Sequence, residues 1–152
     1  MSEAKSDVAG SLVPVVQQQA IVLLEAGYLW MDLGRMDLAK DVFTGAAALM
    51  PKSEVPQIAL GTLEFVQGKH EKALQAYRAA QRLAPKSSLP RAHAGEALLF
   101  LGKTAEAEKE LKAAQTVEPD GDGARLAAAL LEASSAGVFK SKSGKPEKKS
   151  KK

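Results

Sequence analysis

The sequence contains no cysteine, and aromatic residues make up only 5% of its 152 residues. The absence of cysteine excludes disulfides, thiolate nucleophiles and cysteine-ligated zinc. Valine, isoleucine and threonine are also scarce, whereas 27 alanines and 19 leucines dominate. Because strands favour β-branched and aromatic residues and helices favour alanine and leucine, the composition predicts an all-α fold.

We also expect neither a membrane span nor a signal peptide. No apolar run approaches the roughly 18 residues that a transmembrane helix needs. Glu3, Lys5 and Asp7 lie in the first ten residues, and glutamines at 17–19 interrupt the apolar stretch that follows. A signal peptide needs a basic start and an unbroken apolar core. We therefore expect a cytoplasmic protein that does not insert into membranes.

The charge is unevenly distributed along the chain. The net charge is +3, but residues 140–152 hold seven lysines and one glutamate, which leaves residues 1–139 mildly acidic. We expect residues 1–10 and the lysine-rich tail, residues 138–152, to be disordered. Because no aromatic residue lies among these lysines to stack on bases, we expect no specific nucleic-acid binding.

Small residues and proline recur with a period of 34 residues. Each of five positions is occupied three times by one residue type: Gly27, Gly61, Gly95; Gly34, Gly68, Gly102; Ala39, Ala73, Ala107; Ala46, Ala80, Ala114; Pro51, Pro85, Pro119. Glycine inside a helix costs about 1 kcal/mol relative to alanine. Its recurrence at 27, 61 and 95 therefore predicts that a neighbouring helix comes too close for a side chain. The second glycine of each unit fits the left-handed end of a helix, and the proline ends the next helix.

This pattern resembles the tetratricopeptide repeat. The first unit carries it as Gly27-x2-Trp30, Ala39-x3-Phe43 and Pro51. The resemblance implies three helical hairpins in a right-handed superhelical stack, within a domain spanning 11–137. We expect an N-terminal helix that starts near residues 11–14 and runs to Leu33, its second half being the first helix of the first repeat. The repeats are expected over 20–53, 54–87 and 88–121, with a capping helix over 124–136. Paired helices are expected over 36–50, 54–67, 70–84, 88–101 and 104–118.

No constellation in the sequence points to catalysis. His70 and His93 fall on different expected elements and lack a patterned carboxylate or serine partner. The run Asp120-Gly-Asp-Gly resembles the start of a calcium loop, but Ala124 replaces the third ligand. We expect a turn there, with Asp122 as a helix cap. The sequence thus predicts no enzyme activity, no metal and no cofactor.

The resemblance implies that the first helix of each pair lines a concave groove. Steps of three, four and three residues along each expected first helix give four positions per repeat. We call these twelve positions the first-helix stripe: Ile21, Leu24, Tyr28, Met31, Val55, Ile58, Thr62, Phe65, Leu89, Ala92, Glu96 and Leu99. Phe100 lies beside them in the sequence. All but Thr62 and Glu96 are apolar or aromatic. Either the protein itself or a dimer contact buries this stripe, or the stripe binds an apolar peptide segment. We expect the second and assign the apolar members, Thr62 and Phe100 to peptide binding.

The length, the three repeats and the extra terminal helices resemble class II chaperones of bacterial type III secretion. The similarity is clearest over Leu89–Leu99 and Gly102–Leu111, and Ala26–Phe43 also runs in register with that family. It implies a chaperone that holds an apolar segment of a secreted translocator in the cytoplasm before export. The alternatives are a co-chaperone of the needle subunit and a general scaffold for protein assembly.

The apolar residues before the first repeat have no partner within it. These are Leu12, Val13, Val15 and Val16. They could pack onto the concave side of the stack or pair with a second copy of the chain. We expect a weak homodimer.

Overall fold

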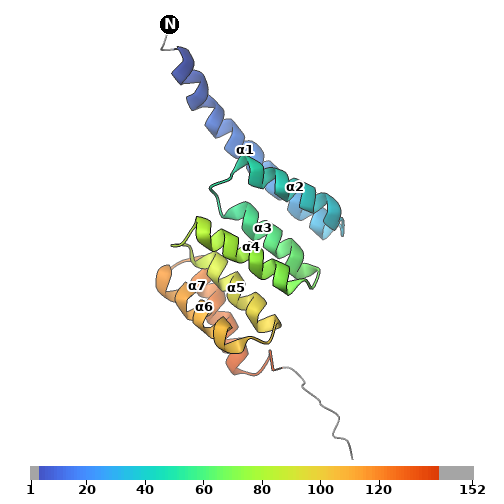
Figure 1. The fold of residues 1–152 in the computed structure, drawn as a ribbon, viewed down its shortest axis with the longest axis vertical. Helices are drawn as coiled ribbons and strands as arrows, with labels where there is room; N and C mark the ends of the chain where they lie inside the picture. The colour runs from blue at the N-terminus through green and yellow to red at the C-terminus, as the bar shows by residue number, and fades with distance from the viewer. Residues whose placement is uncertain (1–3, 141–152) are drawn as a thin grey trace, which may run out of the picture.

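The computed structural model describes residues 4–140, with side chains from residue 17 onward. This part of the chain contains seven helices and no strand, which confirms the all-α fold (Figure 1). The helices are α1 (Ala4–Asp32), α2 (Met36–Leu49), α3 (Val55–Val66), α4 (His70–Leu83), α5 (Ser88–Phe100), α6 (Thr104–Val117) and α7 (Asp122–Ser135).

The helices pair in chain order. α1 packs on α2, α3 on α4 and α5 on α6, and the pairs stack through contacts of α2 with α3 and of α4 with α5 (Figure 1). α7 packs on both α5 and α6 and covers the end of the stack, as predicted. The bounds of α2 to α7 lie within two residues of those that the 34-residue period predicts.

The N-terminal prediction is wrong in one respect. α1 begins at Ala4 and runs through Pro14, so residues 4–10 are helical and not disordered. The beginning of α1 extends past α2 in the view of Figure 1. The disorder expected for residues 1–3 and 141–152 concerns residues outside the described part of the chain.

Glycine ends the first helix of every hairpin in the same way. Gly34, Gly68 and Gly102 have φ angles of +73°, +74° and +74°, in the left-handed region that glycine adopts without strain. The next N–H in each turn donates to a carbonyl five residues back, as from Lys69 to Glu64 at 2.9 Å. This repeated turn reverses the chain and sets α2, α4 and α6 against their partners.

The glycines inside the first helices mark close contacts between helices. A Cβ built on Gly27 would collide with the ring of Phe43, and one on Gly61 would collide with Tyr77. In the third repeat, the side chain of Leu111 occupies the corresponding space at Gly95. The prediction that a neighbouring helix leaves no room for a side chain is confirmed.

Large side chains from each repeat form the core. Phe43 and Tyr77 are fully buried, as is Leu98, which agrees with the sequence. Trp30 and Leu60, which the pattern also predicts to be buried, are only partly buried. Small alanines between the large residues allow the helices to approach each other: Ala39, Ala46, Ala73, Ala80, Ala107 and Ala114.

A carboxylate links the end of the third hairpin to its beginning. Oε2 of Glu118 accepts hydrogen bonds from the Ser88 N–H at 2.9 Å and from the Ser88 hydroxyl at 2.7 Å. These bonds lower the pKa of Glu118, the hydroxyl bond contributing most. The nearby prediction of Asp122 as a helix cap is wrong. Gly121 is the N-cap of α7, and Asp122 pairs with Arg125 instead.

Candidate functional site

The first-helix stripe divides into buried, intermediate and exposed positions. Four of its members belong to the hydrophobic core: Leu24, Ile58, Ala92 and Leu99. This corrects the prediction that they line an accessible groove. Leu24, Ile58 and Ala92 occupy the same position in successive repeats, so their burial is a property of the stack. Leu99 is only 2% exposed because α7 packs on the helix that carries it.

Four large predicted residues are open to solvent. The exposed fractions are 53% for Ile21, 39% for Tyr28, 43% for Val55 and 51% for Phe100. Met31, Thr62, Phe65 and Leu89 have intermediate burial. Leu89 occupies the repeat position of Ile21 and Val55 but lies beside α7 at the covered end of the stack. The accessible part of the stripe is therefore smaller than the sequence suggests.

Polar groups lie at the middle of the stripe. Glu96 Oε2 lies 3.2 Å from Nδ1 of His93, and the His93 ring stacks on Tyr77 at 5.1 Å between centroids. Burial raises the pKa of Tyr77 to about 12 and also raises that of Tyr28. Both tyrosines therefore stay neutral at physiological pH. Tyr77 is fully buried, whereas the exposed Tyr28 offers a hydroxyl that can donate and accept hydrogen bonds.

Aromatic side chains gather where the hairpin turns lie. The centroids of Phe65 and Phe100 are 5.0 Å apart, and the His70 ring lies within 5.0 Å of each. Phe139 contacts Phe100 at 5.5 Å. The sequence places residue 139 in a disordered tail, so its ordered packing is a correction. The signal in the sequence was the apolar pair Val138-Phe139, which precedes the run of lysines.

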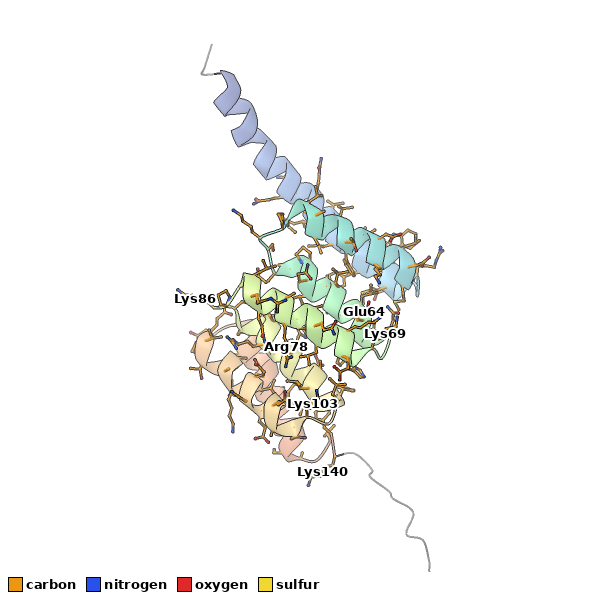
Figure 2. All side chains as sticks on the ribbon, viewed as in Figure 1. Glu64, Lys69, Arg78, Lys86, Lys103 and Lys140 are labelled. Atoms are coloured by element: carbon orange, nitrogen blue, oxygen red, sulfur yellow. The ribbon has the colours of Figure 1, made fainter. Side chains whose placement is uncertain are left out.

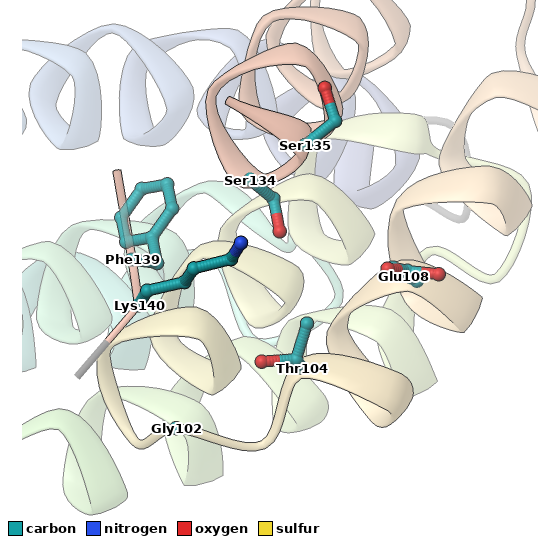
Figure 3. A pocket seen from close by; sticks show the side chains of 7 residues that line it. All are labelled: Gly102, Thr104, Glu108, Ser134, Ser135, Phe139 and Lys140. Carbon is teal, nitrogen blue, oxygen red and sulfur yellow. The ribbon is translucent and has the colours of Figure 1, made fainter. Parts of the chain in front are cut away.

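Three surface hollows accompany these apolar residues. One, of about 490 Å³, lies at the first hairpin and is lined by Gln18, Gln19, Val22, Leu23 and Leu49. Two others lie at the opposite end of the stack. A hollow of about 440 Å³ lies between the start of α6 and the end of α7, beside Phe139 and Lys140 (Figure 3). Another, of about 390 Å³, includes Phe100 and Val138 in its lining.

The described residues offer little for metal binding or membrane insertion. No group of three or more metal-ligating side chains lies together in this part of the chain. None of its helices is long and apolar enough to cross a bilayer. The arrangement can bury apolar groups and form hydrogen bonds to a ligand, which is the chemistry of a peptide-binding surface.

Comparisons with known proteins agree with this fold. Residues 58–87 match the family described as Tetratricopeptide repeat. No curated protein matches the sequence. The first tetratricopeptide domain of human RPAP3 is 23% identical, with a TM-score of 0.69 and coverage of 82% of this chain and 95% of that one.

Two bacterial structures are equally similar. The type III secretion translocator chaperone SycD of Yersinia enterocolitica is 24% identical, with a TM-score of 0.68 and coverage of 76% of this chain and 90% of its own. PcrH of Pseudomonas aeruginosa is 25% identical, with a TM-score of 0.67 and coverage of 78% and 92%. The chain therefore carries a tetratricopeptide repeat at residues 58–87, and its fold resembles those of SycD and PcrH.

Proposed function

We propose that this protein is a chaperone or adaptor that binds an apolar segment of a client protein on the exposed part of the first-helix stripe. The observation that carries the proposal is the exposure of Ile21, Tyr28, Val55 and Phe100 on the first helices of three successive hairpins. A contiguous apolar surface on a monomer favours association with another protein.

The more specific proposal is a type III secretion chaperone for translocator proteins. The resemblance to SycD, which is a translocator chaperone, supports it, as does the likeness to PcrH. Such a chaperone acts in the cytoplasm and keeps an apolar client from aggregating before export. A co-chaperone of the needle subunit and a general scaffold are the alternatives, and both would use the same surface.

The stripe differs from a surface that recognises acidic C-terminal peptides. The first tetratricopeptide domain of Spaghetti (RPAP3), another structural neighbour, is bound to the HSP90 peptide SRMEEVD. The first-helix stripe of the present chain contains no lysine, arginine or asparagine that would pair with such a peptide. Apolar side chains of the client therefore supply most of the binding energy along the stripe.

A weak to moderate affinity follows from the area available. Burying about 400 Å² of apolar surface contributes about 10 kcal/mol at ~25 cal/mol/Å². Lost translational, rotational and side-chain freedom takes back about 4–15 kcal/mol. We therefore expect a micromolar dissociation constant for a short peptide, with little dependence on salt.

The proposal is tested by placing charges on the exposed part of the stripe. Ile21→Glu combined with Val55→Glu changes two solvent-exposed positions and leaves the buried members intact. Leu83→Glu is the control, because this leucine is similarly exposed but lies on a second helix, away from the stripe and from the hollow at the first hairpin. Proteins that co-purify with the natural chain should be lost from the first variant and kept by the second. Equal co-purification with both variants contradicts the proposal.

A further inference from the structure

The segment after α7 repeats a turn that elsewhere leads into a second helix. We call residues 137–140 the strap. The Val138 N–H donates to the Ala133 carbonyl at 3.1 Å, and the Lys103 N–H makes the same bond to Leu98 at 2.9 Å, where α6 follows. α5 and α7 also begin 34 residues apart. α7 is therefore built like the first helix of a fourth repeat, with the strap at the place where its second helix would start.

The strap lacks the contact that holds a second helix in the complete repeats. In the third repeat, the side chain of Leu111 fills the space beside Gly95. The residue of α7 that lies 34 positions later is Ala129, and it is exposed. Within the described part of the chain, residues 138–140 make two backbone hydrogen bonds, and both lie inside the turn around Gly137. Displacing the strap therefore disrupts far fewer contacts than displacing a second helix.

Phe139 is the side chain by which the strap reaches the proposed client surface. Its ring meets that of Phe100 edge-on, with 5.5 Å between the centroids and 69° between the planes. Phe100 is one of the four exposed residues on which the proposed function rests. The rings of Phe65 and His70 complete the group, and the centroid of each lies 5.0 Å from that of Phe100. Phe139 thus already occupies part of the surface that we assign to the client.

The surface around Phe100 is only partly covered by the strap. Phe100 is 51% exposed with Phe139 in place, and Phe139 itself is only partly buried. The rings of both residues line the hollow of about 390 Å³ between the strap and the end of α5. Figure 2 shows Lys140 on the same side of the stack as Lys69 and Lys103, which mark the two preceding hairpin turns. A client that follows the stripe toward these turns therefore meets the strap.

The rings, and not the charges, distinguish this place on the surface. Lys69 lies 3.8 Å from Glu64, and Lys103 lies 4.0 Å from Glu71, so positive and negative side chains stand together. In contrast, three of the four phenylalanines of the protein gather here. An aromatic ring gains from edge-to-face packing on other rings beyond the area that it buries. The side chain that fits best in place of Phe139 is therefore another aromatic one.

We propose that the strap is an internal occupant of the client surface, and that an aromatic side chain of the client displaces Phe139 from Phe100. The inference rests on the proposed function and adds to it the chemical class of one client residue. Because strap and client compete, the apparent dissociation constant equals the intrinsic one divided by the fraction of molecules whose strap is open. Opening the strap therefore strengthens client binding.

Two uncharged peptides test this competition on the full chain. The probe is acetyl-Ser-Gly-Phe-Gly-Ser-amide, and its control carries leucine in place of phenylalanine. In titrations of the ¹⁵N-labelled protein, the probe should shift the amide signals of Phe100, Leu101 and Gly102, which line the hollow. It should bind Phe139→Ala about tenfold more tightly than the natural chain. The leucine peptide should bind this variant at least about threefold more weakly than the probe.

Two results overturn the inference in these titrations. The first is that the probe binds Phe139→Ala no more tightly than the natural chain, because Phe139 would then not compete with it. The second is equal affinity of the two peptides, because the position would then not select an aromatic side chain. Circular dichroism establishes that the variant retains its helices.

A pair of glycine variants opens the strap without changing its aromatic ring. Gly137 has a φ of +84°, so Gly137→Ala strains the turn that holds Phe139 and should strengthen probe binding about threefold. Gly34→Ala is the matched control, because Gly34 has a φ of +73° in the turn between α1 and α2. It should leave the affinity unchanged. An equal change in both variants overturns the inference, because the effect would then come from general destabilisation.

A label on the strap reports its displacement directly. The chain contains no cysteine, and Val138 is 69% exposed, so Val138→Cys can carry a single trifluoromethyl group. Saturation with the probe should move the ¹⁹F signal toward its position in the chain that also carries Phe139→Ala. A signal that stays in place while the amide signals of α5 shift shows that the probe binds beside a closed strap, which overturns the inference.

The outcome is separable from that of the proposed function. Ile21→Glu with Val55→Glu should leave probe binding and the ¹⁹F shift intact, because neither residue contacts the strap. If the probe does not displace the strap but these two charges abolish co-purification of the client, the competition is wrong and the stripe stands. If the charges leave co-purification intact while the probe displaces the strap, the stripe is wrong.

Discussion

The ring of Tyr77 lies over Gly61, in the space that a Cβ atom at position 61 would occupy. Phe43 has the same relationship to Gly27 one repeat earlier. These contacts join the two helices of a hairpin, and they explain why glycine recurs every 34 residues in the middle of the first helices.

Two alanine substitutions should therefore have opposite effects. Gly61→Ala should lower the free energy of unfolding by about 1–3 kcal/mol, because the methyl group collides with Tyr77. Gly45→Ala, in α2, should raise it by about 0.5–1 kcal/mol, since nothing lies within 4 Å of the added atom. Urea denaturation measures both changes. A gain in stability in the Gly61 variant is incompatible with the described helix contact.

The Glu118–Ser88 contact should make stability depend on pH. Hydrogen bonds from Ser88 lower the pKa of Glu118 below its ordinary value of 4.5. A carboxylate with a depressed pKa in the folded state stabilises the protein above its unfolded pKa, and this contribution disappears as pH falls through the folded value. The melting temperature of the natural chain should exceed that of Glu118→Gln at pH 7. The difference should shrink as the pH falls from about 5 to about 2, a range that spans the ordinary pKa of a glutamate. A difference that stays constant over this range refutes the assignment.

Truncations should separate Phe139 from the lysine-rich segment. Removal of residues 141–152 should leave the melting temperature unchanged, because the contacts that hold Phe139 lie within residues up to 140. Removal of residues 138–152 should cost about 1–2 kcal/mol, since it exposes Phe100 and deletes a partly buried ring. Differential scanning calorimetry compares the two. Equal melting temperatures would show that Phe139 contributes nothing to the fold.

The first hairpin is where we propose that a homodimer forms. Val22 and Leu29 on α1, and Leu33 just after it, are each more than half exposed, and Val22 lines the hollow of about 490 Å³. Sedimentation should show weaker self-association for a chain lacking residues 1–16 and for Val22→Glu. A dimer that survives both changes uses another surface.

Much of the fold follows from periodicity alone. Glycine, alanine and proline mark fixed positions in the 34-residue unit, so the bounds of α2 to α7 agree closely with the prediction. The start of α1 was missed because Pro14 fits the first turn of a helix, whereas the helix runs through it. The repeat pattern carries no information about where a helix begins before the first unit.

The burial of each stripe side chain was harder to predict. Positions 24, 58 and 92 look like surface positions on a single helix, but the neighbouring helices of the stack bury them. Phe139 was missed for a different reason. Composition assigned it to a charged tail, and only the turn at Gly137 directs it onto Phe100.

Site-specific photocrosslinking tests the central claim, client binding on the exposed stripe, most directly. A benzoylphenylalanine is placed at Ile21 or Val55, with Leu83 on α4 as the control position, and the protein is irradiated in its native cells. We predict that one apolar client crosslinks to the protein from positions 21 and 55 and does not crosslink from position 83. Crosslinks to the same proteins from all three positions, or none from 21 and 55, would contradict it.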